Sequence, residues 1–436
     1  MGQYSKRLKN KLNKLINEIA ENPSLWVRNS RTDFARNRKI TIRDLIRILL
    51  SAGGNSMNKE LYYYFKLSDK TVSASAFVQQ RDKLLPDALD YLLHEFNSVC
   101  YDVKLYNGYR LFSVDGSTMT YNGSPDDGTY VPKSGKGVNQ FHVNAMYDLL
   151  NRVYADIIVQ PKPHANEPEA AWKMMERLSL TDKTIMIADR GYGGVNLIEH
   201  INRIPNADYL IRVKNGLWKE IRDLPMVDLD IEITINLRTT QTNADKEAYA
   251  SGDAKWVAGH GKYKKLQTAT WDFESPYSLK VRIVRFKISE NTWETIATSL
   301  PKDKFPPSVL KYLCHLRWGI ETSFRELKYA IGVTNFHARK PDSVLQEIFA
   351  RIVMYNFCER ITMHVVIDND KGRKWQYQAN YTMGIYICLD FFRYIGDEPP
   401  DTEEKIRHYI LPIRPNRADR RKVTPKPAVY FLYRVA

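Results

Sequence analysis

Apolar residues recur along this chain with two different periods, and the change of period divides it. Up to about residue 105 they return at three- and four-residue steps, as in KRLKNKLNKLINEIAEN and TIRDLIRILLSAGG, which is the spacing of amphipathic helices. Thr41 can cap the second helix, and Gly53 and Gly54 can end it. The first 105 residues are predicted to be helical, which suits either a helix-turn-helix reader of DNA or an ordinary small helical bundle.

From Tyr109 the pattern becomes that of strands. The runs YRLFSVDG, FHVNAMYDLL and RVYADIIVQ predict three successive strands, and EPEAAWKMMERL predicts a helix after them. Two more strands are expected in TIMIAD and ADYLIRVK, with the helix-like VNLIEHINRI between them. Strands followed by alternating helices and strands predict an α/β fold.

A different pattern interrupts this order between residues 215 and 299. IEITINLRTT and LKVRIVRFKIS alternate like strands, whereas the polar NADKEAYASGDAKWVAGHGKYKK between them is typical of a loop or a hairpin. The segment is therefore predicted to be a mostly β insertion. Helices are expected again in KYLCHLRWGIETSFRELKYA and RIVMYNFCERITMHV.

The first of these late helices, residues 311–330, carries two unlike stripes. A neighbouring stripe beside the apolar one places Glu321 within about a turn of Arg317, Arg325 and Lys328. One carboxylate ringed by cations can hold a metal and a phosphate together. The apolar stripe, which is predicted to face the core, consists of Leu313, Leu316, Ile320, Phe324, Leu327 and Ile331.

Two aspartates upstream could complete such a site. Asp115 follows the short apolar run LFSV and precedes a Gly-Ser break, and Asp189 ends the run TIMIA before a glycine-rich loop. Acids at the carboxyl ends of strands point into the crevice where α/β sheets bind ligands. With Glu321 they would offer oxygen ligands to Mg²⁺ or Mn²⁺. The alternative for each acid is that it caps a turn or pairs with a neighbouring arginine.

Charge is concentrated at the two ends. The net charge is +15, and residues 1–50 hold 12 Lys/Arg against 4 Asp/Glu, while residues 401–436 hold 9 against 4. Basic ends around a nearly neutral, acid-bearing middle favour a protein that grips DNA and does chemistry in a separate pocket. A solubilising charge bias or disordered tails would be the alternative.

Other residue types narrow the chemistry further. The four cysteines form no CxxC pair, which argues against a zinc site and a disulfide framework. No apolar run reaches the ~20 residues that span a bilayer, so a cytoplasmic protein without membrane contacts is expected. The nine histidines lack paired metal-binding spacing. Only His142 and His164, between the two aspartates, lie where they could matter.

The three acids and the helix together resemble a known family. Asp115 in VDGS, Asp189 in ADRGY, and a helix with RWGIE and a lysine seven residues after the glutamate are similar to the bacterial DDE transposases of the insertion-sequence-four family. That family's helix signature is Tyr, two residues, Arg, three residues, Glu, six residues, Lys. Arg317, Glu321 and Lys328 fit it. The similarity extends over nearly the whole chain.

The resemblance implies a fold and a division of the chain. The expected fold is α/β, with an RNase H-like catalytic core, an N-terminal all-helical domain, and a mostly β insertion between the second Asp and the Glu. The expected divisions are a helical DNA-binding domain (1–105), the RNase H-like core in two parts (106–214 and 300–365), the β insertion (215–299), and a basic C-terminal region for DNA or subunit contacts (366–436).

It also implies an activity. Such a transposase binds the inverted-repeat ends of an insertion sequence, cleaves the phosphodiester backbone with Mg²⁺ or Mn²⁺, and joins the ends to target DNA. Asp115, Asp189 and Glu321 would be the catalytic metal ligands, holding two ions per site. A homodimer on DNA, in the bacterial cytoplasm at the nucleoid, is expected. The alternatives are a metal-dependent nuclease without strand transfer, or a DNA-binding regulator derived from a transposase.

Several residues are expected to contact DNA. Arg317 and Lys328 would hold a phosphate, and Arg325 would either do the same or pair with Glu321. Arg190 and Tyr192, directly after Asp189, are placed to contact the backbone or to pack the loop. Two tryptophans are the candidates for base stacking, with a core position as the alternative for each: Trp293, at the family's base-stacking position, and Trp318. Cys314 stands at the family's tyrosine position, so the phosphate contact of a tyrosine hydroxyl would be missing there.

Overall fold

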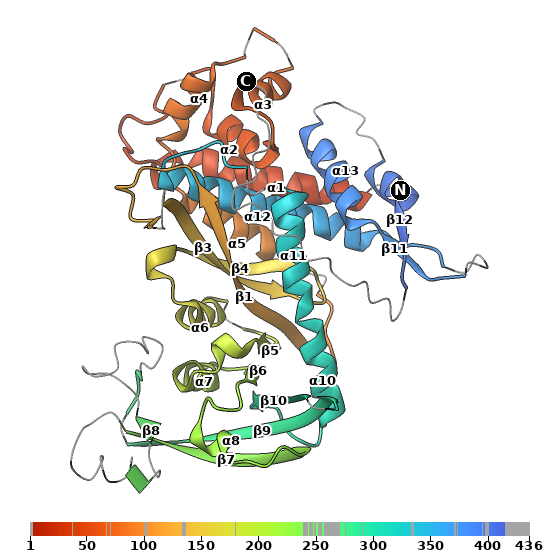
Figure 1. The fold of residues 1–436 in the computed structure, drawn as a ribbon. Helices are drawn as coiled ribbons and strands as arrows, with labels where there is room; N and C mark the ends of the chain where they lie inside the picture. The colour runs from red at the N-terminus through yellow and green to blue at the C-terminus, as the bar shows by residue number, and fades with distance from the viewer. Residues whose placement is uncertain are drawn as a thin grey trace. The chain divides into compact units, whose positions relative to one another are not determined.

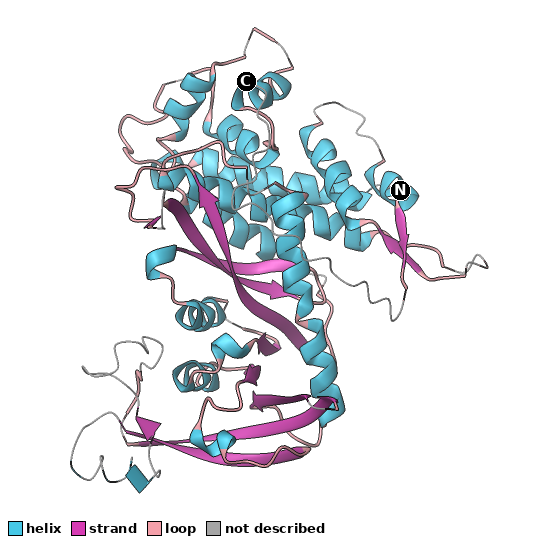
Figure 2. Cartoon of the chain, viewed as in Figure 1, coloured by secondary structure: helices cyan, strands magenta, loops and turns pink. Residues whose placement is uncertain are grey.

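The fold is described from a computed structural model of the chain. It covers residues 3–414 except 37, 67, 70, 100–102, 133–136, 179, 239–242, 244–246, 248–249, 252–254, 257–270, 275, 291, 333–334, 370–371, 373, 395 and 397–400. The basic C-terminal segment from residue 415 on, and most of the polar segment within the predicted insertion, therefore lie outside the described residues. Helices and strands are mixed, as the sequence predicts (Figure 2).

Ten strands of the described residues form one mixed sheet. Its order is β2-β3-β1-β5-β6-β10-β9-β7-β8, and β4 pairs with β3. The strands are β1 (Tyr109–Tyr121), β2 (Tyr130–Val131), β3 (Val138–Asp148), β4 (Val153–Pro161), β5 (Lys183–Ala188), β6 (Ala207–Val213), β7 (Leu229–Arg238), β8 (Lys255–Trp256), β9 (Tyr277–Ser289) and β10 (Thr292–Thr298). The short strands β11 (Tyr377–Ala379) and β12 (Ile410–Pro412) form a separate pair.

Strand direction follows the connections predicted from the sequence. β3 and β4 form an antiparallel hairpin, whereas β1, β5 and β6 run parallel. The chain passes from β1 to β5 through β2, the β3–β4 hairpin and α6, and from β5 to β6 through α7. β10 then returns antiparallel to β6, and β9 and β7 extend the same sheet. The strands expected in residues 215–299 are therefore added to one edge of the central sheet.

The chain divides into two compact units. The first comprises Met1–Asp102, Met119–Gln140 and Phe324–Ala436, and the second comprises Val103–Thr118 and Phe141–Ser323. Helices of the first unit are α1 (Gln3–Glu21), α2 (Ile42–Ser51), α3 (Met57–Tyr64), α4 (Ala74–Arg81), α5 (Asp87–Ser98), α12 (Pro341–His364), α13 (Tyr381–Arg393) and α14 (Thr402–His408). Those of the second unit are α6 (Glu167–Arg177), α7 (Val195–Asn202), α8 (Lys219–Arg222) and α10 (Pro307–Leu316), and α11 (Trp318–Tyr329) runs across the division.

Both faces of the parallel strands are covered in the second unit. On one face, α6 and α7 contribute Met174 and Ile198 to an apolar core with Phe112 of β1. On the other face, Leu313 of α10 packs with Ile187 of β5 and neighbouring strand residues. Figure 1 shows α6 and α7 on the opposite side of these strands from α10. Parallel strands buried on both faces explain why their sequences are nearly continuous apolar runs.

Helix α12 organises the first unit. It packs against α1, α2, α5 and α13, and eighteen of its residues are buried. A helix buried on all sides shows no amphipathic stripe, which fits the even spread of apolar residues along RIVMYNFCERITMHV. In the same unit, Thr41 and Asp44 form a capping box at the start of α2, so the predicted cap is confirmed. None of the described helices has the length and apolarity needed to cross a membrane.

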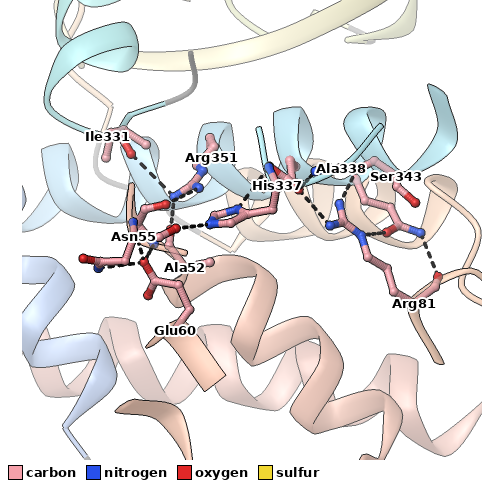
Figure 3. Close-up of polar contacts among 12 residues, drawn as sticks. Ala52, Asn55, Glu60, Arg81, Ile331, His337, Ala338, Ser343 and Arg351 are labelled. Atoms are coloured by element: carbon pink, nitrogen blue, oxygen red, sulfur yellow. Dashed lines mark hydrogen bonds and ion pairs between the residues drawn. The ribbon is translucent and has the colours of Figure 1, made fainter. Parts of the chain in front are cut away.

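Polar side chains on α12 form hydrogen bonds and ion pairs in the interior of the first unit (Figure 3). Arg81 of α4 lies with Nη1 2.7 Å from Glu347 Oε1, and its Nε donates to Gln346 at 2.8 Å. The Glu347 carboxylate also accepts from the backbone N–H of His337 at 3.0 Å. Arg351 donates to the backbone carbonyls that follow α2. Arg81 and Glu347 are only 2% and 3% exposed, so hydrogen bonds from several elements compensate their desolvation.

Candidate active site

Backbone register brings the two aspartates to neighbouring positions. The last parallel pair between β1 and β5 is Val114 with Ala188, and Asp115 and Asp189 are the next residue on each strand. Asp189 directly follows β5 and accepts a hydrogen bond from the backbone N–H of Arg190 at 2.7 Å. The prediction that a strand precedes each aspartate is thus confirmed, and the parallel pairing of the two strands is a finding of the structure.

The strand-end expectation for Asp115 is wrong in one respect. β1 does not stop at the Gly-Ser break but continues to Tyr121, because β1 also lies beside β3 in the sheet. Asp115 is therefore inside a long strand, at the point where its pairing with β5 ends. Its Oδ1 accepts from the backbone N–H of Gly116 at 2.8 Å.

Glu321 is linked to Asp189 through a buried arginine. Arg317 Nη2 lies 2.9 Å from Glu321 Oε1 and 3.8 Å from Asp189 Oδ2. The Arg317 side chain is 3% exposed, whereas those of Asp189 and Glu321 are 42% and 38% exposed. The guanidinium thus occupies the floor of the site, and the carboxylates stand between it and solvent.

A junction between two helices places Arg317 there. The sequence predicts one helix over residues 311–330, and the structure divides it into α10 and α11 on either side of Arg317. Arg317 keeps helical angles (φ −49°, ψ −34°), so the chain continues in the same sense. The predicted apolar stripe is confirmed, with Leu316 only partly buried and the others buried: Leu313, Ile320, Phe324, Leu327 and Ile331.

A second arginine, Arg212 of strand β6, forms an ion pair with Asp189. Its Nη1 lies 3.3 Å from Asp189 Oδ1, and its Nε pairs with Glu294 of β10. Sequence reasoning missed Arg212 and Glu294. The available signal was a charged residue inside the otherwise apolar run YLIRV, because a buried strand tolerates an arginine only beside an acid.

The neighbouring acids affect the pKa of Asp115. Burial has the largest effect and raises its pKa above the ordinary value, and the carboxylates of Glu167 and Glu321 raise it further. The Gly116 N–H and the Arg317 guanidinium act in the opposite direction. Asp115 and Glu321 therefore belong to one electrostatic cluster with Arg317.

The donors in this cluster fit a hard divalent cation. Three carboxylates supply oxygen ligands of the kind that Mg²⁺ and Mn²⁺ prefer, and two of them are open to solvent. In the part of the chain that the structure describes, no three acidic, histidine or cysteine side chains are drawn together as a metal cage. Arg317 supplies the positive charge between the acids instead. Its buried Nε has no hydrogen-bond partner among the described residues.

The remaining residues of the helix differ in exposure. Arg325 is exposed, and Lys328 is half-buried, with its pKa lowered by burial. Both lie on the part of α11 that belongs to the first unit, whereas the three acids belong to the second. Trp318 is 50% exposed, and the Arg317 guanidinium lies 5.4 Å from its ring centre.

Beside Asp189, the loop residues point in different directions. Arg190 is exposed, whereas Tyr192 is buried in the core on the α6–α7 face. Trp293 is partly exposed on β10, and the ammonium group of Lys287 lies 5.9 Å from its ring centre.

Cys314 lies in the apolar cluster beneath the site. It is 8% exposed and packs with Leu310 and Leu313 of the same helix. Burial raises the pKa of its thiol to about 12, and the charges that influence it include Glu294 and Arg317. The sulfur therefore sits at the boundary between the core and the charged cluster.

Comparison with known proteins identifies the central part of the chain. Residues 106–357 match the family model of the transposase DDE domain. The transposase for insertion sequence element IS421 of Escherichia coli is 25% identical over 240 residues, which cover 52% of this chain and 62% of that protein. The InsL proteins of the IS186 elements of E. coli K12 match over the same length with the same identity. The chain thus spans less than two thirds of these curated relatives.

Among solved structures, the cryo-EM structure of the piggyBac transposase synaptic complex with hairpin DNA is similar at a TM-score of 0.49 and 12% identity. The alignment covers 94% of this chain and 87% of that one. A likeness at this level is too remote to support an argument about fold or function.

Proposed function

Because this chain belongs to the family of proteins with a transposase DDE domain, we propose that it is a transposase that cleaves DNA at the ends of an insertion sequence and joins them to target DNA. The observation that carries the proposal is the register of β1 and β5. It sets Asp115 beside Asp189 at the end of their parallel pairing, with Glu321 linked to Asp189 through Arg317.

The three acids are proposed to hold Mg²⁺ or Mn²⁺, as two ions per site. Asp115, Asp189 and Glu321 would hold such ions, which would supply activation of the attacking water or 3′-hydroxyl and stabilisation of the leaving oxygen of a phosphodiester. The chain's own contribution is to hold the carboxylates within one cluster and to keep a guanidinium beneath them. Exposure of Asp189 and Glu321 leaves room for ions and DNA to enter from solvent.

Arg317 and Lys328 are proposed to bind the phosphate next to the cleaved bond. A guanidinium offers two parallel N–H donors to a phosphate, and Lys328 acts as a point charge. Arg317 can move from carboxylate to phosphate only when other cations replace it among the acids. The exposed Arg325 and Arg190 are proposed as further backbone contacts, whereas Tyr192 is buried and packs the core instead.

Two tryptophans are proposed to contact unpaired bases. The half-exposed ring of Trp318 and the partly exposed ring of Trp293 are accessible for stacking. Stacking of a base on an aromatic side chain contributes about 1–3 kcal/mol.

The layout proposed for the whole chain follows the family. An RNase H-like core comprises residues 106–214 and 300–365, and the β insertion comprises 215–299. Residues 1–105 are proposed to bind DNA, and residues 366–436 to contact DNA or a second subunit, since most of the net positive charge lies at the two ends. The protein would act at the bacterial nucleoid.

Strand joining distinguishes this function from a simple nuclease. The purified chain is incubated with Mg²⁺, DNA carrying its element's own ends, and a supercoiled target plasmid. Joined products support a transposase. Cleavage without joining would support a metal-dependent nuclease, and end binding without cleavage would support a regulator derived from a transposase.

A further inference from the structure

A buried histidine lies against the backbone that carries Asp115. His142 of β3 is 3% exposed, and its ring packs onto Gly116. A Cβ added at Gly116 would lie 2.2 Å from His142 Nε2 and 3.1 Å from Glu167 Oε1. Since real Cβ atoms do not approach so closely, position 116 must be glycine for this imidazole and carboxylate to sit where they do.

Both ring nitrogens of His142 face polar groups of neighbouring elements. Nε2 lies 2.8 Å from Glu167 Oε1, close in distance although not fully aligned for a hydrogen bond. Nδ1 lies 3.3 Å from the Lys162 ammonium and 3.5 Å from Thr118 Oγ1. An ammonium can only donate and a carboxylate can only accept. The imidazole thus lies between an ammonium on its Nδ1 side and a carboxylate on its Nε2 side.

The partner of His142 is itself fixed. Glu167 is the first residue of α6, a position that favours a negative charge, and its helix is capped by the Asn166 side chain. Contact with the His142 imidazole has the largest effect on Glu167 and holds its pKa below the ordinary value. The end of α6 and strand β3 are thus tied together directly beside Gly116.

From these contacts we propose that His142 and Glu167 are positioning residues for Asp115. The Gly116 N–H donates to Asp115 Oδ1 at 2.8 Å, so the carboxylate is oriented by the peptide that the imidazole supports. The inference rests on the proposed function, in which Asp115 binds a divalent ion. Groups that support a metal ligand from behind commonly change metal affinity or activity 10- to 100-fold when removed.

Mn²⁺ binding and DNA cleavage by the full chain test the proposal. His142→Ala is expected to weaken Mn²⁺ binding, measured by titration calorimetry without DNA, by about tenfold or more. Its kcat for cleavage should fall by a similar factor, with an unchanged KM for end DNA. His142→Gln should recover most of both, because an amide offers a donor towards Glu167 and an acceptor towards Lys162.

A matched histidine in the same unit supplies the control. His200 of α7 pairs with Asp272 at 3.0 Å and stacks on Trp172, and none of these residues touches the acid cluster. His200→Ala should reproduce any general loss of stability, seen as a lower Tm, with Mn²⁺ affinity and kcat close to those of the unmodified protein. His142→Ala within twofold of His200→Ala in both quantities would overturn the proposal.

Two further variants separate the possible failures. If His142→Ala does not fold, Glu167→Ala tests the proposal in its place, because the Glu167 side chain is 38% exposed and its loss should be tolerated by the fold. Glu167→Ala should weaken Mn²⁺ binding, whereas Glu167→Gln should not. Unchanged Mn²⁺ binding in Glu167→Ala would overturn the proposal. Asp115→Asn tests the proposed function itself: if it binds Mn²⁺ and cleaves like the unmodified protein, the metal role of Asp115 is wrong.

Discussion

Arg317 and Glu321 are joined across one helical turn, with Nη2 of the arginine 2.9 Å from Oε1 of the glutamate. The same guanidinium reaches Asp189, so one buried cation neutralises acids from a strand end and from a helix. Like charges so close repel one another unless a cation lies between them. A divalent ion entering this cluster must therefore compete with a residue of the protein itself.

That competition predicts opposite effects for a single substitution. Arg317→Ala should bind Mn²⁺ roughly tenfold more tightly without DNA, equivalent to about 1.4 kcal/mol, because the competing charge is gone. DNA cleavage should fall, because the proposed phosphate contact is lost. Calorimetry and a cleavage assay measure the two effects. Arg325→Ala, which removes an exposed arginine from α11, should leave Mn²⁺ affinity unchanged. Weaker Mn²⁺ binding in Arg317→Ala would mean that the guanidinium organises the acids instead of competing for them.

Isosteric replacement of each acid should abolish the chemistry and spare DNA binding. Asp115→Asn, Asp189→Asn and Glu321→Gln keep the shape of the side chain but remove a charged oxygen ligand. Cleavage of end DNA should drop to background in each, while a mobility-shift assay still detects end binding. Cleavage above trace level in Asp189→Asn would remove that residue from the metal site.

The buried Arg81–Glu347 pair of the first unit predicts that the stability of the protein depends on pH. Burial alone would raise the pKa of Glu347, but Arg81, His337 and Arg351 outweigh it and hold the pKa well below the ordinary value of 4.5. A carboxyl with a depressed folded pKa stabilises the protein above its unfolded pKa, and this contribution is lost as pH falls further. Glu347→Gln should therefore lower the free energy of unfolding by about 3–5 kcal/mol at pH 7. The deficit should shrink as pH falls below 4.5.

An exposed acid on the same helix is the control for Glu347. Asp342 pairs with Arg28, and both side chains are nearly half exposed. Asp342→Asn should cost no more than about 1 kcal/mol. Denaturant unfolding of both variants at several pH values makes the comparison. Equal losses in the two variants would show that burial does not strengthen the Arg81–Glu347 pair.

At Cys314 two physical effects compete. A tyrosine there would supply the hydroxyl that the family signature contains, and a phosphate contact of this kind contributes about 1.5–3 kcal/mol. The cysteine is buried among leucines, however, so the larger ring should overpack the cluster and cost about 1–3 kcal/mol of stability. We expect Cys314→Tyr to lower Tm. A faster joining rate despite the lower Tm would show that the ring reaches DNA; a lower Tm with no faster joining would assign Cys314 to the core.

The basic C-terminal segment predicts a salt effect. Each phosphate contact contributes about −0.9 to the slope of log K against log salt concentration on B-DNA. Deleting residues 414–436, most of which lie outside the described part of the chain, should flatten that slope for end binding. Weaker binding with the same slope would point to folding or subunit contacts instead.

The sequence was sufficient to predict helices and strands, but not to predict which of them pair or pack with one another. The apolar steps from Leu313 to Ile331 identified a helical core face, and the runs before Asp115 and Asp189 identified strands, although not their parallel pairing. The pattern after Asp115 is that of a turn, and only pairing with β3, a tertiary contact, keeps the chain extended there. Side-chain spacing on the helix also could not show that Arg317 points inwards to the acids.

Contacts between distant residues were beyond the sequence for a related reason. His142 and Glu167 meet because a hairpin and a helix fold back beside β1, and no spacing rule links their positions. Arg212 and Glu294 likewise meet through the β6–β10 pairing. Each such pair depends on which strands become neighbours, which the local apolar pattern leaves undetermined.

Because Val114 pairs with Ala188, the face of the sheet on which each aspartate lies depends on the number of residues that precede it in its strand. Successive side chains on a strand point to opposite faces, so one inserted residue before Asp115 would turn its carboxylate to the other side of the sheet. Two inserted residues would restore the face but carry the acid away from Asp189. Substitutions around these strands can be absorbed by repacking, whereas a change in length cannot. Evolution of this chain should therefore admit new residues in β1 and β5 far more readily than new positions.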